Sequence, residues 1–104
     1  MEDKIFRDFF LGFIKLHILY HSKKEEIYGK EFKNELARHG YDISFGTLYP
    51  IFHKLEKNGY LVSRKANIEG KIRKYYSITD KGNAILKKSK HRARELFNEL
   101  FENQ

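Results

Sequence analysis

The spacing of apolar residues changes from helical to alternating at Leu61 and back to helical after Thr79, and these changes constrain the fold most strongly. Apolar side chains recur every three to four residues in the segments 5–20, 27–39, 44–59 and 84–101. Between the last two, residues 61–66 alternate and residues 71–78 are rich in β-branched and aromatic side chains, which is typical of strands. The predicted order is therefore helix, helix, helix, strand, strand, helix.

The residues between these segments predict how they are joined. Gly40 can end the second helix in a left-handed conformation, and Ser44 can cap the third, so that a short segment links the two helices. Residues 67–70 (Asn-Ile-Glu-Gly) suit a hairpin turn, and Thr79 can cap the last helix. A helix-turn-helix followed by a β-hairpin is a winged helix. The expected fold class is mainly α, a winged helix-turn-helix (α-α-α-β-β-α) with a long C-terminal helix.

The length of 104 residues suits one domain, and we expect residues 1–104 to form a single winged-helix domain. Its expected parts are the first helix (5–20), the helix-turn-helix (27–59), the wing hairpin (60–78) and the C-terminal helix (79–102). The first helix is apolar on more than one face, and so short a chain has little material to cover two faces. This pattern favours a partner subunit, with the first and last helices as the dimerisation elements.

Basic residues are concentrated in one block of the chain. Residues 64–94 contain eleven Lys or Arg and two acidic residues, and the whole chain carries a net charge of +7. Such a block attracts polyanions, with nucleic acid the first candidate and an anionic membrane the second. The absence of Cys excludes disulfide scaffolds and cysteine zinc fingers. Charged residues interrupt the longest apolar stretch, residues 5–20, so we expect no membrane span and a cytoplasmic protein.

The third helix and the hairpin carry the residues expected to meet nucleic acid. Opposite its apolar stripe, the third helix is small and polar at its start and basic further on, at Lys54, which suits a helix in the major groove. The hairpin interleaves basic residues with Tyr75 and Tyr76, which suits phosphate and minor-groove contacts. On a strand, one face would hold Lys71, Arg73 and Tyr75, and the other Ile72, Lys74 and Tyr76.

Three segments form a specific combination of motifs. They are residues 44–50 (Ser-Phe-Gly-Thr-Leu-Tyr-Pro) followed by 55–61 (Leu-Glu-Lys-Asn-Gly-Tyr-Leu), Tyr28-Gly29, and residues 71–82 (Lys-Ile-Arg-Lys-Tyr-Tyr-Ser-Ile-Thr-Asp-Lys-Gly). This combination resembles the PadR family of transcriptional regulators, over most of the chain from about Phe10 to about Leu100. The short length resembles the smaller PadR subfamily with a single C-terminal helix. The resemblance implies a homodimeric repressor on an inverted-repeat operator in double-stranded DNA.

The resemblance also implies roles for individual residues. DNA would be contacted by Tyr28, by Ser44, Thr47, Tyr49 and Pro50 of the third helix, and by Lys71, Arg73, Lys74 and Tyr75 of the wing. The dimer interface would include Phe6, Phe9, Phe13, Ala93, Leu96, Phe97, Leu100 and Phe101. A small aromatic or drug-like effector would bind between the helices at this interface and release the DNA.

Other functions stay open on the residues alone. The basic wing would equally suit a winged-helix module that binds an acidic protein, or a protein that coats DNA without sequence preference. His17 and His21 share a helical face, but the sequence places no third ligand beside them, so we expect no metal. No Gly-rich phosphate loop or nucleophile–base pair is visible, so we expect neither catalytic residues nor a cofactor.

Overall fold

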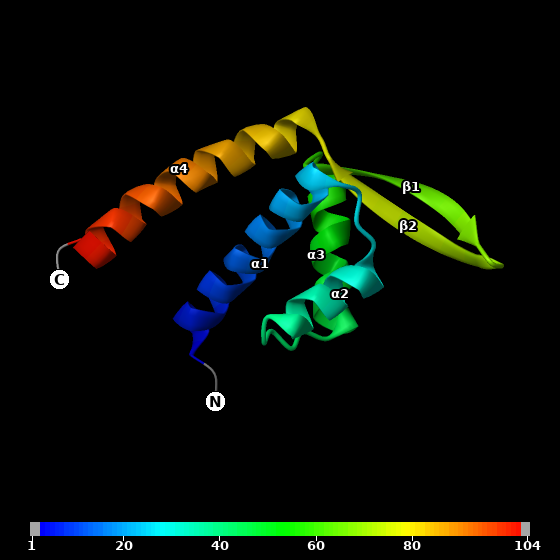
Figure 1. Ribbon diagram of the computed structural model, residues 1–104, viewed down its shortest axis with the longest axis horizontal. Coiled ribbons are helices and arrows are strands. Elements are labelled where there is room, and N and C mark those ends of the chain that lie inside the picture. Colours follow the sequence, from blue (N-terminus) through cyan, green and yellow to red (C-terminus); the bar gives the residue numbers. More distant parts are fainter. Residues whose placement is uncertain (1–2, 103–104) are drawn as a thin grey trace.

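The computed structural model describes residues 3–102, which form four helices and a two-stranded antiparallel sheet (Figure 1). The elements are α1 (Lys4–Lys24), α2 (Gly29–Arg38), α3 (Phe45–Lys57), β1 (Leu61–Ile68), β2 (Lys71–Ile78) and α4 (Asp80–Glu102). Their order confirms the predicted winged helix-turn-helix. The first helix is longer than the predicted 5–20, because it continues through a polar last turn whose basic residues interact favourably with the helix dipole.

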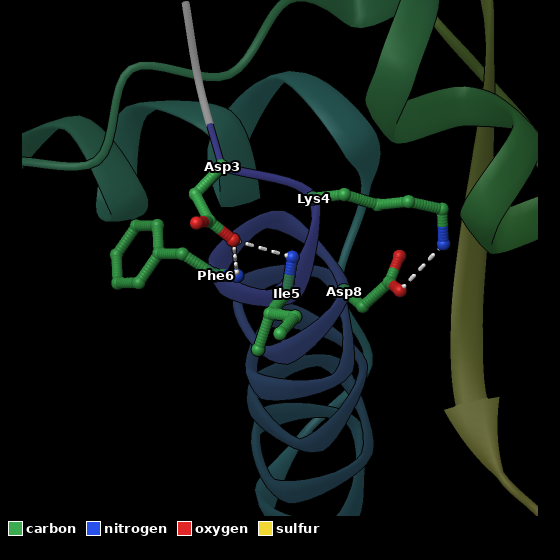
Figure 2. A network of polar contacts seen from close by, with 5 residues as sticks. All are labelled: Asp3, Lys4, Ile5, Phe6 and Asp8. Carbon is green, nitrogen blue, oxygen red and sulfur yellow. Dashed lines mark hydrogen bonds and ion pairs between the residues drawn. The ribbon is translucent and has the colours of Figure 1, made fainter.

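Asp3 fixes the start of α1. Its carboxylate accepts hydrogen bonds from the backbone N–H groups of Ile5 and Phe6, at 2.8 and 3.4 Å (Figure 2). The next residue, Lys4, has its Nζ 3.0 Å from Oδ2 of Asp8, which lies one turn along the helix. Since Ile5 and Phe6 are both exposed, the first turn is held by these local polar contacts rather than by packing against the core.

The boundaries of the helix-turn-helix follow the predicted signals. Gly40 has a φ of +87°, in the left-handed region that glycine adopts without strain. Ser44 caps α3, because its Oγ accepts a hydrogen bond from the N–H of Thr47 at 3.2 Å. The short segment between these residues holds α2 and α3 at the angle seen in Figure 1.

The core lies where α1, α2, α3 and β2 meet. Phe52 of α3 is fully buried and packs edge-on against Phe32 of α2, with ring centroids 5.8 Å apart, and at 4.6 Å from Tyr76 of β2. Ile14 and Ile18 from α1 complete this cluster. Tyr76 is therefore a core residue, and the strand face that carries it packs inward.

The wing is a hairpin with a two-residue turn. Glu69 (φ +50°) and Gly70 (φ +83°) form this turn, because β1 extends to Ile68 rather than ending before the predicted turn at 67–70. Asn67 Oδ1 accepts a hydrogen bond from the N–H of Gly70 at 2.9 Å. Two positive φ values are typical of the type I′ turns that match the twist of a hairpin.

A third chain segment extends the sheet at its root. The backbone of Ile27, just before α2, exchanges two hydrogen bonds with Tyr76, at 2.9 and 2.7 Å. β2 therefore has β1 on one side and residue 27 on the other. This pairing attaches the wing directly to the start of α2.

The last helix begins as predicted and then leaves the core. Thr79 Oγ1 accepts a hydrogen bond from the N–H of Gly82 at 3.0 Å and donates one to the carbonyl of Gly59 at 2.6 Å. Ile85 and Leu86 pack against the core, but every residue from 91 to 102 is exposed. Figure 1 shows α4 running away from the wing and from α2. Among the helices of residues 3–102, none has an apolar stretch of the length that a membrane span requires.

Candidate nucleic-acid interface

The outward face of α3 is small, polar and basic. Leu48, Phe52 and Leu55 are buried, whereas the opposite face exposes Gly46, Tyr49, Pro50, His53, Lys54 and Lys57. Ser44 is exposed, and its hydroxyl serves the cap and donates to Thr47 Oγ1 at 3.3 Å. Four of the five predicted contacts from this helix and its cap are therefore exposed, while Thr47 is half-buried. α3 is continuous through Pro50.

Tyr49 contacts a neighbouring aromatic ring on this face. Its ring stacks on Phe45 with centroids 4.9 Å apart and planes at 19°, and Lys33 Nζ lies 5.4 Å from the Phe45 ring. A Cβ at Gly29 would lie 2.4 Å from Tyr49 Cε1, so a side chain at position 29 would displace this ring. The sequence pattern does not single out Phe45 or Lys33, because an exposed aromatic–cation contact between two helices leaves no periodic signal.

Aromatic and guanidinium groups form a ladder across the middle of the wing, from Tyr28 to Arg64 and Arg73. The guanidinium carbon of Arg73 lies 4.4 Å from the centroid of the Tyr28 ring. Tyr28 contacts Tyr75 edge-on at 5.4 Å, and the Arg64 guanidinium lies 4.8 Å from the Tyr75 ring. The fold thus brings Tyr28, Arg73 and Tyr75 together, as the predicted set requires, and adds Arg64. Rings and guanidinium groups in such contact attract each other through the ring quadrupole.

A carboxylate lies on each face of the wing. On the outer face, Glu26 accepts two hydrogen bonds from Arg64, one of them to Nε at 2.9 Å. On the inner face, Glu56 of α3 accepts a hydrogen bond from Ser63 of β1 and lies 3.0 Å from Lys74 Nζ of β2. These hydrogen bonds, from Arg64 and from Ser63, hold the pKa values of Glu26 and Glu56 below their usual range.

The predicted wing contacts therefore fall into two groups. Lys71 is exposed at the tip, and Arg73 and Tyr75 lie half-buried on the outer face of β2. Lys74 lies on the inner face, where its hydrogen bond with Glu56 raises its pKa. Its ammonium group is thus already paired inside the protein. The sequence pattern does not reveal the roles of Glu26 and Glu56, since their partners come from other elements.

The predicted dimerisation residues form an exposed apolar surface on α1 and α4. Phe6 and Phe9 are exposed, and Phe13 is half-buried. All five residues predicted on α4 are exposed: Ala93, Leu96, Phe97, Leu100 and Phe101. A mainly apolar groove of about 760 Å³ lies between the two helices, and it is lined by Phe9, Phe13 and all five of the α4 residues.

The two histidines of α1 lie inside a ring cluster. The rings of His17 and His21 are nearly parallel, with centroids 5.9 Å apart, and Phe13 and Phe32 contact them edge-on. Burial lowers the pKa of both histidines. Within residues 3–102, no three His, Cys, Asp or Glu side chains lie close enough together to hold a metal ion.

Comparisons with known proteins give matches along most of the chain. The model of the transcriptional regulator PadR-like family matches residues 18–88. Transcriptional regulator Rv3488 of Mycobacterium tuberculosis is 40% identical over 98 residues, which cover 94% of this chain and 92% of that protein. The crystal structure of a PadR family transcriptional regulator from Eggerthella lenta is 31% identical, with a TM-score of 0.82 over 94% of this chain and 87% of that chain. A PadR-like transcription factor from Bacteroides fragilis shares the fold, with a TM-score of 0.84, 24% identity and coverage of 98% of this chain and 100% of that chain.

Proposed function

The chain belongs to the PadR-like family of DNA-binding transcriptional regulators, which are not enzymes, and we propose that it acts in the cytoplasm as a homodimeric repressor on an inverted-repeat operator. One observation carries this proposal: the exposed face of α3 is continuous with the basic outer face of the wing. Tyr49 of α3 packs at Gly29, and the neighbouring Tyr28 packs on Arg73. A helix for the major groove and cations for the adjacent backbone thus share one surface.

The position of each proposed DNA-binding residue determines which part of the DNA it contacts. In the proposal, the start of α3 approaches base edges through Thr47, Tyr49 and Pro50, while Ser44 and Tyr28 contact the phosphate backbone. Lys54 contacts phosphates from further along the helix. Lys71 and Arg73 bind the backbone from the wing, together with the Tyr75 hydroxyl. The pairing of Lys74 with Glu56 supports a weaker contribution from Lys74.

Exposed apolar area supports the homodimer. Six predicted interface side chains are each more than half exposed: Phe6, Phe9, Leu96, Phe97, Leu100 and Phe101. Such residues offer roughly 600 Å² of apolar surface per protomer, close to the ~800 Å² that one partner buries in a standard interface. In an inverted repeat, the two copies of α3 would then lie about one DNA turn apart, roughly 34 Å.

The same surface supports a second proposal, release by a small molecule. The groove between α1 and α4 is mainly apolar, and a planar aromatic compound would fit its chemistry. A compound bound there would change the angle between the two protomers and thus the distance between their recognition helices. A set of planar aromatic molecules would be added to the complex of the protein with fluorescently labelled DNA. Compounds that release the DNA should lower its fluorescence anisotropy. Unchanged anisotropy with every compound would exclude this mechanism for the compounds used.

Selection from a pool of random-sequence duplexes tests the DNA-binding proposal. The protein should enrich an inverted repeat, and it should bind that duplex at least a hundredfold more tightly than a scrambled duplex of equal length at moderate salt. Salt-sensitive binding without enrichment would instead support a protein that coats DNA. Absence of binding to any duplex would refute the proposal and favour an acidic protein partner.

Sedimentation tests the dimer. The protein should sediment with about twice the 12.5 kDa chain mass at micromolar concentration, and Phe97→Ser should shift it toward the monomer. Ile72→Ser is the matched control, because Ile72 is an equally exposed apolar residue on the wing, away from α4. A wild-type monomer, or a dimer unaffected by Phe97→Ser, would contradict the proposed interface.

A further inference from the structure

Glu26 is an acidic residue within a surface that would bind a polyanion. It lies two residues before Tyr28 and beside the basic outer face of the wing. A carboxylate at this place repels phosphates, so electrostatics alone would disfavour it. Its side chain is half-buried and bonded rather than free in solvent.

The contacts of Glu26 join distant parts of the chain. Both carboxylate oxygens accept from the guanidinium group of Arg64, which is 38 residues away in the sequence. This two-point geometry fixes the orientation of the guanidinium plane as well as its distance. Because Arg64 belongs to β1, the pair ties the outer strand of the wing to the segment that precedes α2.

Arg64 is connected through ring contacts to the residues proposed to bind DNA. Its guanidinium lies over Tyr75, Tyr75 contacts Tyr28, and Tyr28 lies under Arg73. Glu56 holds the inner face of the same hairpin through Ser63 and Lys74. The wing is therefore held from both faces, and on the outer face Glu26 is the acidic group that Arg64 contacts.

We propose that Glu26 is a positioning residue for DNA binding, which acts through Arg64 to hold the wing and the Tyr28–Arg73 contact in the orientation that fits the operator. This inference rests on the proposed DNA-binding function. In the proposed arrangement, Glu26 neutralises the charge of Arg64, which has a structural role, while Arg73 and Lys71 face the phosphates.

The direction in which one substitution changes the affinity for DNA separates a positioning role of Glu26 from a purely electrostatic one. Glu26→Gln raises the net charge of the chain by one unit from +7, so electrostatics alone predicts tighter binding to DNA. Positioning predicts weaker binding to the selected operator, by about two- to tenfold, because two copies of a partly exposed ion pair are lost for each bound dimer. Glu69→Gln at the wing tip is the matched control, since it adds the same charge without touching Arg64, and it should not weaken binding.

A double-mutant cycle tests whether Glu26 acts through Arg64. Fluorescence anisotropy would be measured for the wild type, Glu26→Gln, Arg64→Gln and the double variant, on the selected operator and on the scrambled duplex. In the Arg64→Gln background, Glu26→Gln should cause no further weakening. The ratio of operator to scrambled affinity should fall in Glu26→Gln, while the melting temperature stays within a few degrees of the wild type.

Three results would overturn the proposal. The first is tighter operator binding by Glu26→Gln, and the second is additive losses of binding free energy in the double-mutant cycle. The third is an equal loss of affinity for the operator and the scrambled duplex together with a lower melting temperature, which would indicate a purely structural role. Failure of the proposed function would be seen separately and earlier, because the wild type would then fail to distinguish the operator from the scrambled duplex.

Discussion

Gly82 offers a direct test of how tightly α4 is joined to the wing. It is the third residue of α4 and is buried. A Cβ at this position would lie 2.2 Å from the carbonyl oxygen of Tyr60 and 2.8 Å from Ile78 Cγ1. The Tyr60 carbonyl belongs to the backbone and accepts a hydrogen bond from the N–H of Thr79 at 3.2 Å, so it cannot swing aside as a side chain could.

Two effects of opposite sign determine the result of Gly82→Ala. Alanine is favoured over glycine within a helix by about 1 kcal/mol. Forcing a methyl group into a packed site costs about 1–3 kcal/mol, and a contact this close to backbone lies at the upper end of that range. We expect a net destabilisation of about 1–2 kcal/mol, which lowers the melting temperature of a domain of this size by about 4–16 °C.

Circular dichroism melting at one fixed protein concentration measures this change, because the stability of a dimer depends on concentration. Gly46→Ala is the control: Gly46 is the second residue of α3, and its added Cβ would meet only Ser44 Oγ at an ordinary 3.7 Å. The control should melt at or above the wild-type temperature. A melting temperature of Gly82→Ala equal to or above the wild type would refute the close-contact argument.

Three further predictions concern the α3 cap, the histidine pair and the basic block. Ser44→Ala should destabilise the protein by about 1 kcal/mol in urea unfolding, because α3 loses its cap. Because burial lowers the pKa values of His17 and His21, their neutral forms stabilise the folded chain above the ordinary histidine pKa of 6.5. This contribution is lost as pH falls through the lowered pKa values, so the melting temperature should fall on acidification. Lys71→Gln should reduce the salt dependence of operator binding, by about 0.9 in log–log slope for each lost phosphate contact, whereas Lys88→Gln should leave it unchanged.

Each of these predictions has a result that contradicts it. Unchanged stability of Ser44→Ala would mean that solvent replaces the cap without loss. In the double variant His17→Gln/His21→Gln, an acid-induced fall as steep as in the wild type would assign the pH effect to other groups. Equal changes in salt dependence for Lys71→Gln and Lys88→Gln would show that α4 also contacts the DNA backbone.

The helix-turn-helix could be predicted because its signals are local. Gly40 and Ser44 act on backbone groups within a few residues of themselves, so their consequences follow from residue type alone. The apolar stripe of α3 likewise follows from helical spacing: Leu48, Phe52 and Leu55 are buried, and Ile51 is partly buried against the core. Each of these features depends on helical geometry and not on distant partners.

The two faces of the wing could be separated by sequence, but not assigned to the core or to solvent. Alternation placed Lys74 with Tyr76 and Arg73 with Tyr75, yet both faces carry basic residues as well as an aromatic ring. Which face packs inward depends on Phe52, whose ring packs against Tyr76, and on Glu56, which forms an ion pair with Lys74. Both partners lie on another element, and their positions follow only from the complete fold.

The basic block of residues 64–94 is continuous in sequence but divided in space. Its first part lies on the wing, where Arg64 and Lys74 are already paired with carboxylates. Its second part lies on α4, which leaves the wing root and runs away from α2 and the wing tip (Figure 1). A single duplex bound at α3 and the wing would meet mainly the unpaired wing cations, because screening limits the reach of the others to about 10 Å at moderate salt. The salt dependence of operator binding should therefore be set by a few wing and α3 residues, and it should be much smaller than the charge of the whole block would suggest.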